Sequence, residues 1–273
     1  GAALELPHIM LLANDPEDLL VGGLGSAAKE NACVYNGNLM QNSGSIKGWV
    51  IQGGNCEKLM EEALKKLSEK GRDSKGNTFL FAVGDGNHSL ATAKAVWEAN
   101  KANLPPDSPV RYALVEVVNI YDTGLTFEPI HRVLFNLDSS ELLETVVKNL
   151  GGTVTNFADS KTLCDSVGQK NAEGARYGFI FQENGKTAYK MLQTSIKDLA
   201  IAALQPCLDN FMAEKNAEKT QIDYIHGSDE VIQLGSVKNN TGILLPPIEK
   251  ESFFATINGR GPLPRKSFSM GEA

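Results

Sequence analysis

Histidine and cysteine are scarce in this chain of 273 residues, which has four of each. The cysteines are far apart in the sequence and include no CxxC pair, so a zinc ribbon and a redox CxxC motif are both excluded. Four scattered cysteines in a chain of this length do not make a disulfide framework either. We therefore expect reduced, mostly buried thiols and a cytoplasmic protein.

Long apolar runs and an excess of basic residues are also missing. No apolar run approaches the roughly 18 residues of a transmembrane helix, so a membrane partner is not expected. The chain has 26 Lys and Arg against 33 Asp and Glu, a net charge of −7. This balance lacks the basic footprint of a nucleic-acid-binding protein, and nucleic acid is not an expected partner. The first residues lack the basic segment of a signal peptide, and Gly1 stands where Met is usual, so we expect a fragment of a longer protein.

What is present is typical of a globular protein, with 42% hydrophobic and 22% charged residues. Apolar runs and helical spacing recur in turn along the chain, which predicts a mixed α+β fold. We expect a helix opened by Asp15, loops over residues 22–45, and an Asn-Gly hairpin around Asn184. A helix is also expected over residues 139–150, with Ser139 or Ser140 as its N-cap. Two parts, 1–137 and 138–273, are expected to pack as one compact unit.

The most informative segment is a buried strand followed by Gly84-Asp85-Gly86-Asn87-His88-Ser89 and then a helix. Two glycines allow a tight turn, and the free N–H groups at a helix start favour an anion. This pattern predicts a phosphate site formed by Gly86, Asn87, His88 and Ser89. It is neither a Walker A loop nor GxGxxG, and a capped turn with an incidental histidine is the plain alternative.

Other candidate residues lie near the remaining histidines and the C-terminal end. His131, Arg132, Arg265 and Lys266 are suited to bind phosphate, because their side chains donate hydrogen bonds and most carry positive charge. His226 lies beside an acidic pair and is a further candidate.

Carboxylates supply the catalytic and metal candidates. Asp85 and Glu128, together with His88, are the expected catalytic residues, with a carboxylate as the base. Asp85 is also the candidate ligand for Mg²⁺, which needs only one or two carboxylates beside a nucleotide.

Four motifs resemble an uncharacterised bacterial and archaeal family that is known only as a domain of unknown function. They are GDGNHSLATAK at 84–94, FEPIHRVLF at 127–135, IDYIHGSDEVIQLG at 222–235 and LPRKSFSMGEA at 263–273. The glycine turn is also similar to the DGHxR-type turn of the ParB/sulfiredoxin-like superfamily, which implies a core of that kind with additional strands and helices. In that superfamily, which includes kinases for free serine, this turn binds nucleotide phosphates. The sequence departs from it by having Asn87 where His is common and Ser89 where Arg is common.

The resemblance implies a nucleotide-binding phosphotransferase that uses ATP or ADP with Mg²⁺. Its substrate would be a small hydroxylated metabolite such as free serine, and a homo-oligomer is left open. One alternative is a metal-dependent hydrolase that uses His88, His131, His226 and Asp85. Another is a non-catalytic, nucleotide-binding regulatory module.

Overall fold

The computed structural model describes residues 7–52, 54–73, 75–170, 173–214 and 220–270, and it confirms the mixed α+β class. The chain forms two compact units, residues 1–122 and 123–273. This division differs from the expected boundary at 137. The reason is that the segment just before 137, His131–Phe135, pairs with two strands from the C-terminal part of the chain.

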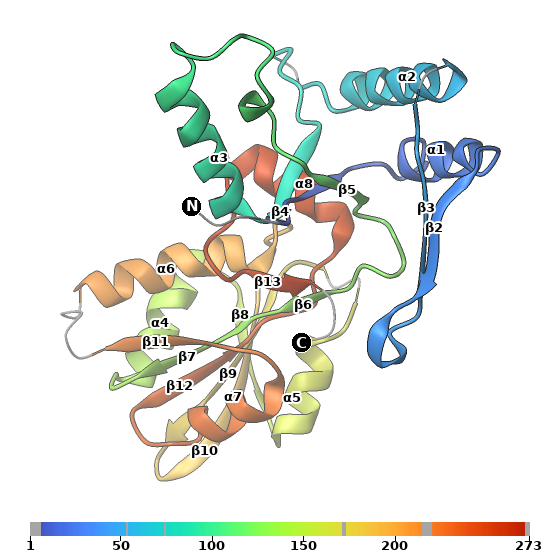
Figure 1. Cartoon of the computed structure of the whole chain (residues 1–273). Helices are drawn as coiled ribbons and strands as arrows, with labels where there is room; N and C mark the ends of the chain where they lie inside the picture. Colours follow the sequence, from blue (N-terminus) through green and yellow to red (C-terminus); the bar gives the residue numbers. More distant parts are fainter. Residues whose placement is uncertain (1–6, 53, 74, 171–172, 215–219, 271–273) are drawn as a thin grey trace. The chain divides into compact units, whose positions relative to one another are not determined.

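The first unit contains a small sheet with the strand order β4-β1-β5 (Figure 1). Its strands are β1 (Met10–Ala13), β4 (Phe81–Asp85) and β5 (Glu116–Asn119). β1 is antiparallel to β4 and parallel to β5. Consequently the end of β4 and the starts of β1 and β5 lie at the same edge of this sheet.

The first unit also contains helices, two of which pack together in an apolar cluster. They are α1 (Val21–Ala28), α2 (Gly54–Lys70) and α3 (Asn87–Asn100), with short 3-10 turns η1 (Met40–Asn42) and η2 (Pro109–Arg111). Leu24 of α1 and Leu67 of α2 are buried in one apolar cluster. The helical spacing over α2 is typical of a helix that buries one face.

Two predictions for the first unit are wrong. Asp15 does not open a helix: residues 16–20 form turns, and the Asp15 carboxylate accepts a hydrogen bond from the Leu20 N–H at 2.8 Å. Residues 22–45 are not all loop. They include most of α1 and the hairpin strand β2 (Cys33–Asn38), which pairs with β3 (Ser45–Trp49).

The second unit is built on a six-stranded sheet with the order β11-β7-β12-β9-β10-β8, in which all neighbours are antiparallel. Its strands are β7 (His131–Phe135), β8 (Thr153–Phe157), β9 (Arg176–Glu183), β10 (Lys186–Gln193), β11 (Gln221–Ile225) and β12 (Asn240–Leu244). The Asn-Gly turn joins β9 to β10 as predicted, with Asn184 at φ 51° and Gly185 at φ 77°. Positive φ at both positions matches a type I′ hairpin, which fits the twist of the strands.

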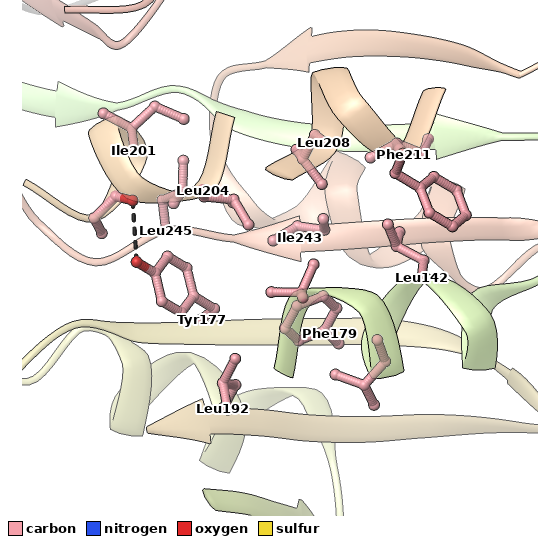
Figure 2. Close-up of a cluster of buried hydrophobic side chains, with 14 of the residues drawn as sticks. Leu142, Tyr177, Phe179, Leu192, Ile201, Leu204, Leu208, Phe211, Ile243 and Leu245 are labelled. Atoms are coloured by element: carbon pink, nitrogen blue, oxygen red, sulfur yellow. Dashed lines mark hydrogen bonds between the residues drawn. The ribbon is translucent and has the colours of Figure 1, made fainter. Parts of the chain in front are cut away.

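Helices cover both faces of this sheet. They are α4 (Ser139–Leu150), α5 (Ser160–Val167), α6 (Ala200–Glu214) and α7 (Ser228–Gly235). α4 and α6 pack on one face, where Phe179 and Leu204 are fully buried (Figure 2). The phenol of Tyr177 in that core donates to the Ala200 carbonyl at 3.1 Å, which satisfies its polar atom (Figure 2). α5 and α7 pack on the opposite face, against Val133 and Ile180.

A short strand pair and one further helix complete the second unit. β6 (Phe127–Pro129) pairs antiparallel with β13 (Phe268–Met270), and α8 (Lys250–Arg260) contributes Phe253, whose ring contacts Phe127 and Phe268. The last three residues of the fourth motif, 271–273, lie outside the described residues. None of the described helices has the length and apolar character needed to cross a membrane. All four cysteines are free thiols: Cys56 and Cys207 are buried, and Cys33 is exposed.

Candidate functional site

The glycine turn of the first unit connects β4 to α3 through Gly86. This residue adopts a left-handed conformation (φ 82°, ψ 19°), which glycine reaches without steric cost. A Cβ at this position would lie 2.4 Å from the His8 carbonyl oxygen and 2.7 Å from the Ile9 Cα. Both the backbone angle and the close approach of the preceding segment therefore require glycine at Gly86.

The start of α3 is open to a ligand. Its N-cap residue, Gly86, offers no side chain, and no side-chain cap is present. The side chains of Asn87 and His88 are exposed and have no hydrogen-bond partner among the described residues. The first N–H groups of this 14-residue helix and its dipole favour an anion at this point. The predicted phosphate residues Gly86, Asn87, His88 and Ser89 are thus contiguous at one helix start.

Three further polar side chains lie at the same edge of the sheet. Asp85 ends β4, and its Oδ1 accepts a hydrogen bond from the Gly86 N–H at 2.7 Å. Met10 pairs with Asp85 on one side and with Glu116 on the other, and the Glu116 carboxylate contacts His8 Nε2 at 2.5 Å. His8 is not among the site residues predicted from the sequence. Its pairing with Glu116 depends on the order of the strands, which no local motif signals.

His131 is buried at the start of β7, in the second unit. Its Nδ1 accepts a hydrogen bond from the Leu245 N–H at 3.0 Å, so this nitrogen carries no proton. Burial lowers the pKa of His131 to about 4, and the nearby charges of Arg132 and His226 lower it further. The imidazole is therefore neutral at pH 7, and it cannot supply positive charge to a phosphate.

Arg132 has no exposed surface, and its guanidinium is held by other parts of the unit. It donates from Nε to Gln205 Oε1 at 2.9 Å, and from its terminal nitrogens to the carbonyls of Ile130 at 2.6 Å and Lys266 at 2.9 Å. The guanidinium also stacks on Tyr224, with 4.5 Å between Cζ and the ring centroid. Burial lowers the pKa of Arg132 to about 10, so the group stays charged at pH 7. These contacts give Arg132 a structural role that its sequence context did not predict.

The other predicted cations of the second unit are exposed. Arg265 and Lys266 follow each other in the loop before β13, and Lys266 Nζ lies 5.0 Å from the centroid of the Tyr224 ring. His226 follows Ile225, which is the β11 partner of His131, and it is exposed. Glu128 is exposed on β6, opposite Ser269 of β13. The second unit thus brings Arg132 and Lys266 to the Tyr224 ring and His226 close enough to His131 to affect its charge, while Asp85 and His88 belong to the first unit.

No group of three or more His, Cys, Asp or Glu side chains suited to hold a metal ion occurs in the part of the chain that the structure describes. His88 and Asp85 lie in one unit and His131 and His226 in the other, and neither set is large enough for a zinc site. Nothing in either unit thus favours the metal-dependent hydrolase with these four ligands. A magnesium ion bound partly by phosphate oxygens needs fewer protein ligands, and Asp85 fits that need.

The fold is of the mixed α+β class, and its glycine turn opens a helix at a sheet edge. The chain belongs to the family described as "Protein of unknown function (DUF1015)", whose model matches residues 1–211. This membership confirms the family resemblance, and the motifs at 84–94 and 127–135 lie within the matched residues. No curated protein matches the chain.

Solved structures similar to this chain are distant in sequence. A conserved hypothetical protein from Pyrococcus furiosus is 12% identical, with a TM-score of 0.43, over 77% of this chain and 81% of the other. Two variants of a free serine kinase in complex with AMP are 12% and 11% identical, both with a TM-score of 0.44, over 78% of this chain and 80% of theirs. At this distance the similarity does not identify an activity.

Proposed function

We propose that this chain binds a nucleotide, ATP or ADP, through its phosphates at the Gly86 turn and transfers the terminal phosphoryl group to a small hydroxylated metabolite. The observation that carries the proposal is the uncapped start of α3, where Gly86, Asn87, His88 and Ser89 are contiguous and exposed or half-buried. Backbone N–H groups there would donate to phosphate oxygens, as would His88 and Ser89.

Asp85 supplies the carboxylate nearest to this turn in the sequence. One of its oxygens, Oδ1, accepts from the Gly86 N–H, and the exposed carboxylate retains Oδ2 for a ligand. Asp85 would therefore bind Mg²⁺ beside the phosphates or accept the proton of the acceptor hydroxyl. In the transfer, the hydroxyl oxygen forms a bond to the terminal phosphorus, and the bond from that phosphorus to the remaining nucleotide breaks.

The proposal is limited to residues of the first unit. The other sequence-predicted residues Glu128, Arg265 and Lys266 are exposed in the second unit and are given no step in the transfer. Free serine is the substrate that the resemblance of the turn favours. His131 and Arg132 are given no part in phosphate binding, because His131 is neutral and buried and Arg132 is fully buried.

The test is binding of ATP and ADP with Mg²⁺ by calorimetry, followed by mass spectrometry of a panel of hydroxy amino acids. We expect His88→Asp to weaken nucleotide binding at least about tenfold, because it places a negative charge beside the phosphates. The same change should stabilise α3 by about 0.3–1 kcal/mol, because an acidic residue in the first turn interacts favourably with the helix dipole. Weaker binding without loss of stability would separate a ligand site from a folding defect.

Ser140→Asp is the matched control. Ser140 is the second residue of α4, as His88 is of α3, and both are exposed. This variant should leave nucleotide affinity unchanged. Absence of nucleotide binding to the unmodified chain would refute the proposal. Binding without any phosphorylated product would reject the phosphotransferase and leave the regulatory module.

A further inference from the structure

A cavity of about 830 Å³ lies at one end of the six-stranded sheet of the second unit. Gln193, at the end of β10, pairs with Arg176 at the start of β9 and with Thr153 at the start of β8, so three strand ends meet there. The volume lies within the roughly 300–1,000 Å³ of small-molecule sites. Every lining residue belongs to the second unit, so this cavity is separate from the Gly86 turn.

Arg176 places a fixed, half-buried positive charge on the cavity wall. Its Nε donates to Gln193 Oε1, and its Nη1 donates to the Ser166 carbonyl at 2.8 Å and to Gln169 Oε1 at 2.6 Å. These three acceptors are uncharged, and Nη2 has no partner among the residues that the structure describes. Because the guanidinium is already held in one position, binding an anion through Nη2 costs little further side-chain entropy.

Two of the three carboxylates on the cavity wall are offset by other groups. Asp198 pairs with Arg260, whose Nε lies 2.6 Å from Asp198 Oδ2. Glu249 is the N-cap residue of α8, where the helix dipole favours a negative charge. Only Glu173 then remains against the cationic side chains of the wall, which are Lys170, Arg176 and Lys197. The cavity therefore has an excess of positive charge, in a chain whose net charge is −7.

Much of the remaining wall is apolar. Ala175 and Leu199 are buried, so the core of the unit fixes this part of the surface. Gly174 brings its backbone close to the end of β10: a Cβ on it would lie 2.1 Å from the Thr194 carbonyl oxygen. The apolar side chains on the wall are Leu150, Ala175, Ile196, Leu199, Pro246 and Pro247. An apolar wall beside one fixed charge suits an organic anion better than an inorganic one.

We infer that this cavity binds an organic carboxylate, whose charged group meets Arg176 Nη2 and whose carbon body covers the apolar wall. A carboxylate carries one negative charge, whereas a phosphate monoester carries nearly two. The three carboxylates of the wall repel a doubly charged group more strongly, so they favour the carboxylate. The inference does not depend on nucleotide binding at the Gly86 turn.

Titration of the complete chain with phenylacetate, followed by calorimetry and amide NMR spectra, tests the inference. We expect shifts concentrated at residues 174–176 and 193–200. Phenylacetate should bind more tightly than acetate, because its larger carbon body covers more of the apolar wall. Arg176→Gln removes the fixed charge and should weaken phenylacetate binding at least about tenfold.

Lys197→Glu is a second variant, which should fold normally because Lys197 is exposed. It reverses one charge on the wall and should weaken phenylacetate binding at least about threefold. Lys186→Glu is the matched control: this lysine is also exposed, but it lies at the start of β10 and outside the cavity wall. Its variant should bind phenylacetate like the unmodified chain.

The remaining outcomes would overturn the inference. No binding of phenylacetate up to about 10 mM would exclude the site. Equal affinity of the unmodified chain, Arg176→Gln and Lys197→Glu would show that phenylacetate binds elsewhere. Equal binding of 2-phenylethanol, which lacks the charge, would reject Arg176 as the group that selects the ligand. Tighter binding of phenyl phosphate than of phenylacetate would reject the carboxylate and indicate a phosphate site.

Discussion

Replacing Arg132 tests whether this cation is structural or binds phosphate. In Arg132→Met the side chain keeps a similar length but loses every donor. Gln205 Oε1 and the carbonyl oxygens of Ile130 and Lys266 would then lose their partner inside the protein. A buried polar group left without a hydrogen bond costs about 1–3 kcal/mol.

The expected loss is about 2–6 kcal/mol in the free energy of unfolding of the second unit, because two buried residues, Gln205 and Ile130, each keep an acceptor that has lost its partner. Asp209 belongs to the same network, because Gln205 Nε2 donates to its carboxylate at 2.9 Å. Removal of the guanidinium leaves that carboxylate without its nearby cation. Since the free energy of unfolding of a domain is typically about 5–15 kcal/mol, the variant should still fold but should unfold at a lower urea concentration.

Urea unfolding followed by circular dichroism measures this loss as a lower midpoint with an unchanged slope. Arg265→Met is the control: this arginine is exposed, and its replacement should change stability by less than about 0.5 kcal/mol. Nucleotide affinity of folded Arg132→Met should equal that of the unmodified chain. A loss of stability below about 1 kcal/mol, combined with a tenfold fall in affinity, would refute the structural role and restore the phosphate role predicted from sequence.

Two more predictions concern His131 and Gly86. The pKa of His131 is about 4 in the folded protein, below its usual 6.5, so the unfolded chain binds a proton first as pH falls. The contribution of His131 to the free energy of unfolding is complete above pH 6.5. It is lost progressively toward pH 4, by about 3 kcal/mol in total. Urea midpoints measured across that range should change less in His131→Asn, whose amide oxygen can still accept from Leu245; an equally steep pH dependence in this variant would contradict the assignment. Gly86→Ala should destabilise the first unit by more than about 1 kcal/mol, because of its positive φ and the nearby His8 carbonyl, whereas Gly25→Ala in α1, with open space around it, should stabilise by about 0.5–1 kcal/mol in the same unfolding assay. Equal effects of the two alanines would show that the turn does not require glycine.

Short-range signals predicted several elements well. The Asn-Gly pair gave the β9–β10 hairpin, because its two positive φ angles depend only on the turn residues themselves. The helix over 139–150 was also predicted, although its N-cap is Asp138 and not a serine. The Asp138 carboxylate accepts from the N–H groups of Ser140 and Glu141. The choice among three neighbouring capping residues depends on where the helical backbone begins.

Other predictions failed where the structure depends on contacts between residues that are far apart in the sequence. The compact units divide after residue 122 and not at the expected 137, because β7 lies between β11 and β12, which come much later in the chain. Residues 22–45 looked like loop because Gly, Asn and Ser are common there. Their hairpin is defined by cross-strand pairing, which composition does not show.

For the candidate site, the sequence by itself determined the glycine turn, because a strand, a turn and a helix start are adjacent in the chain. It also indicated the family, through motifs of which two, at 84–94 and 127–135, lie within the residues that the family model matches. Tertiary structure alone decided that Arg132 is buried, that His131 is neutral at pH 7, and that His8 meets Glu116 at the same sheet edge as Asp85. The physical reason is that burial and charge depend on which strands become neighbours, and the order of strands in a sheet is set by packing of the whole unit.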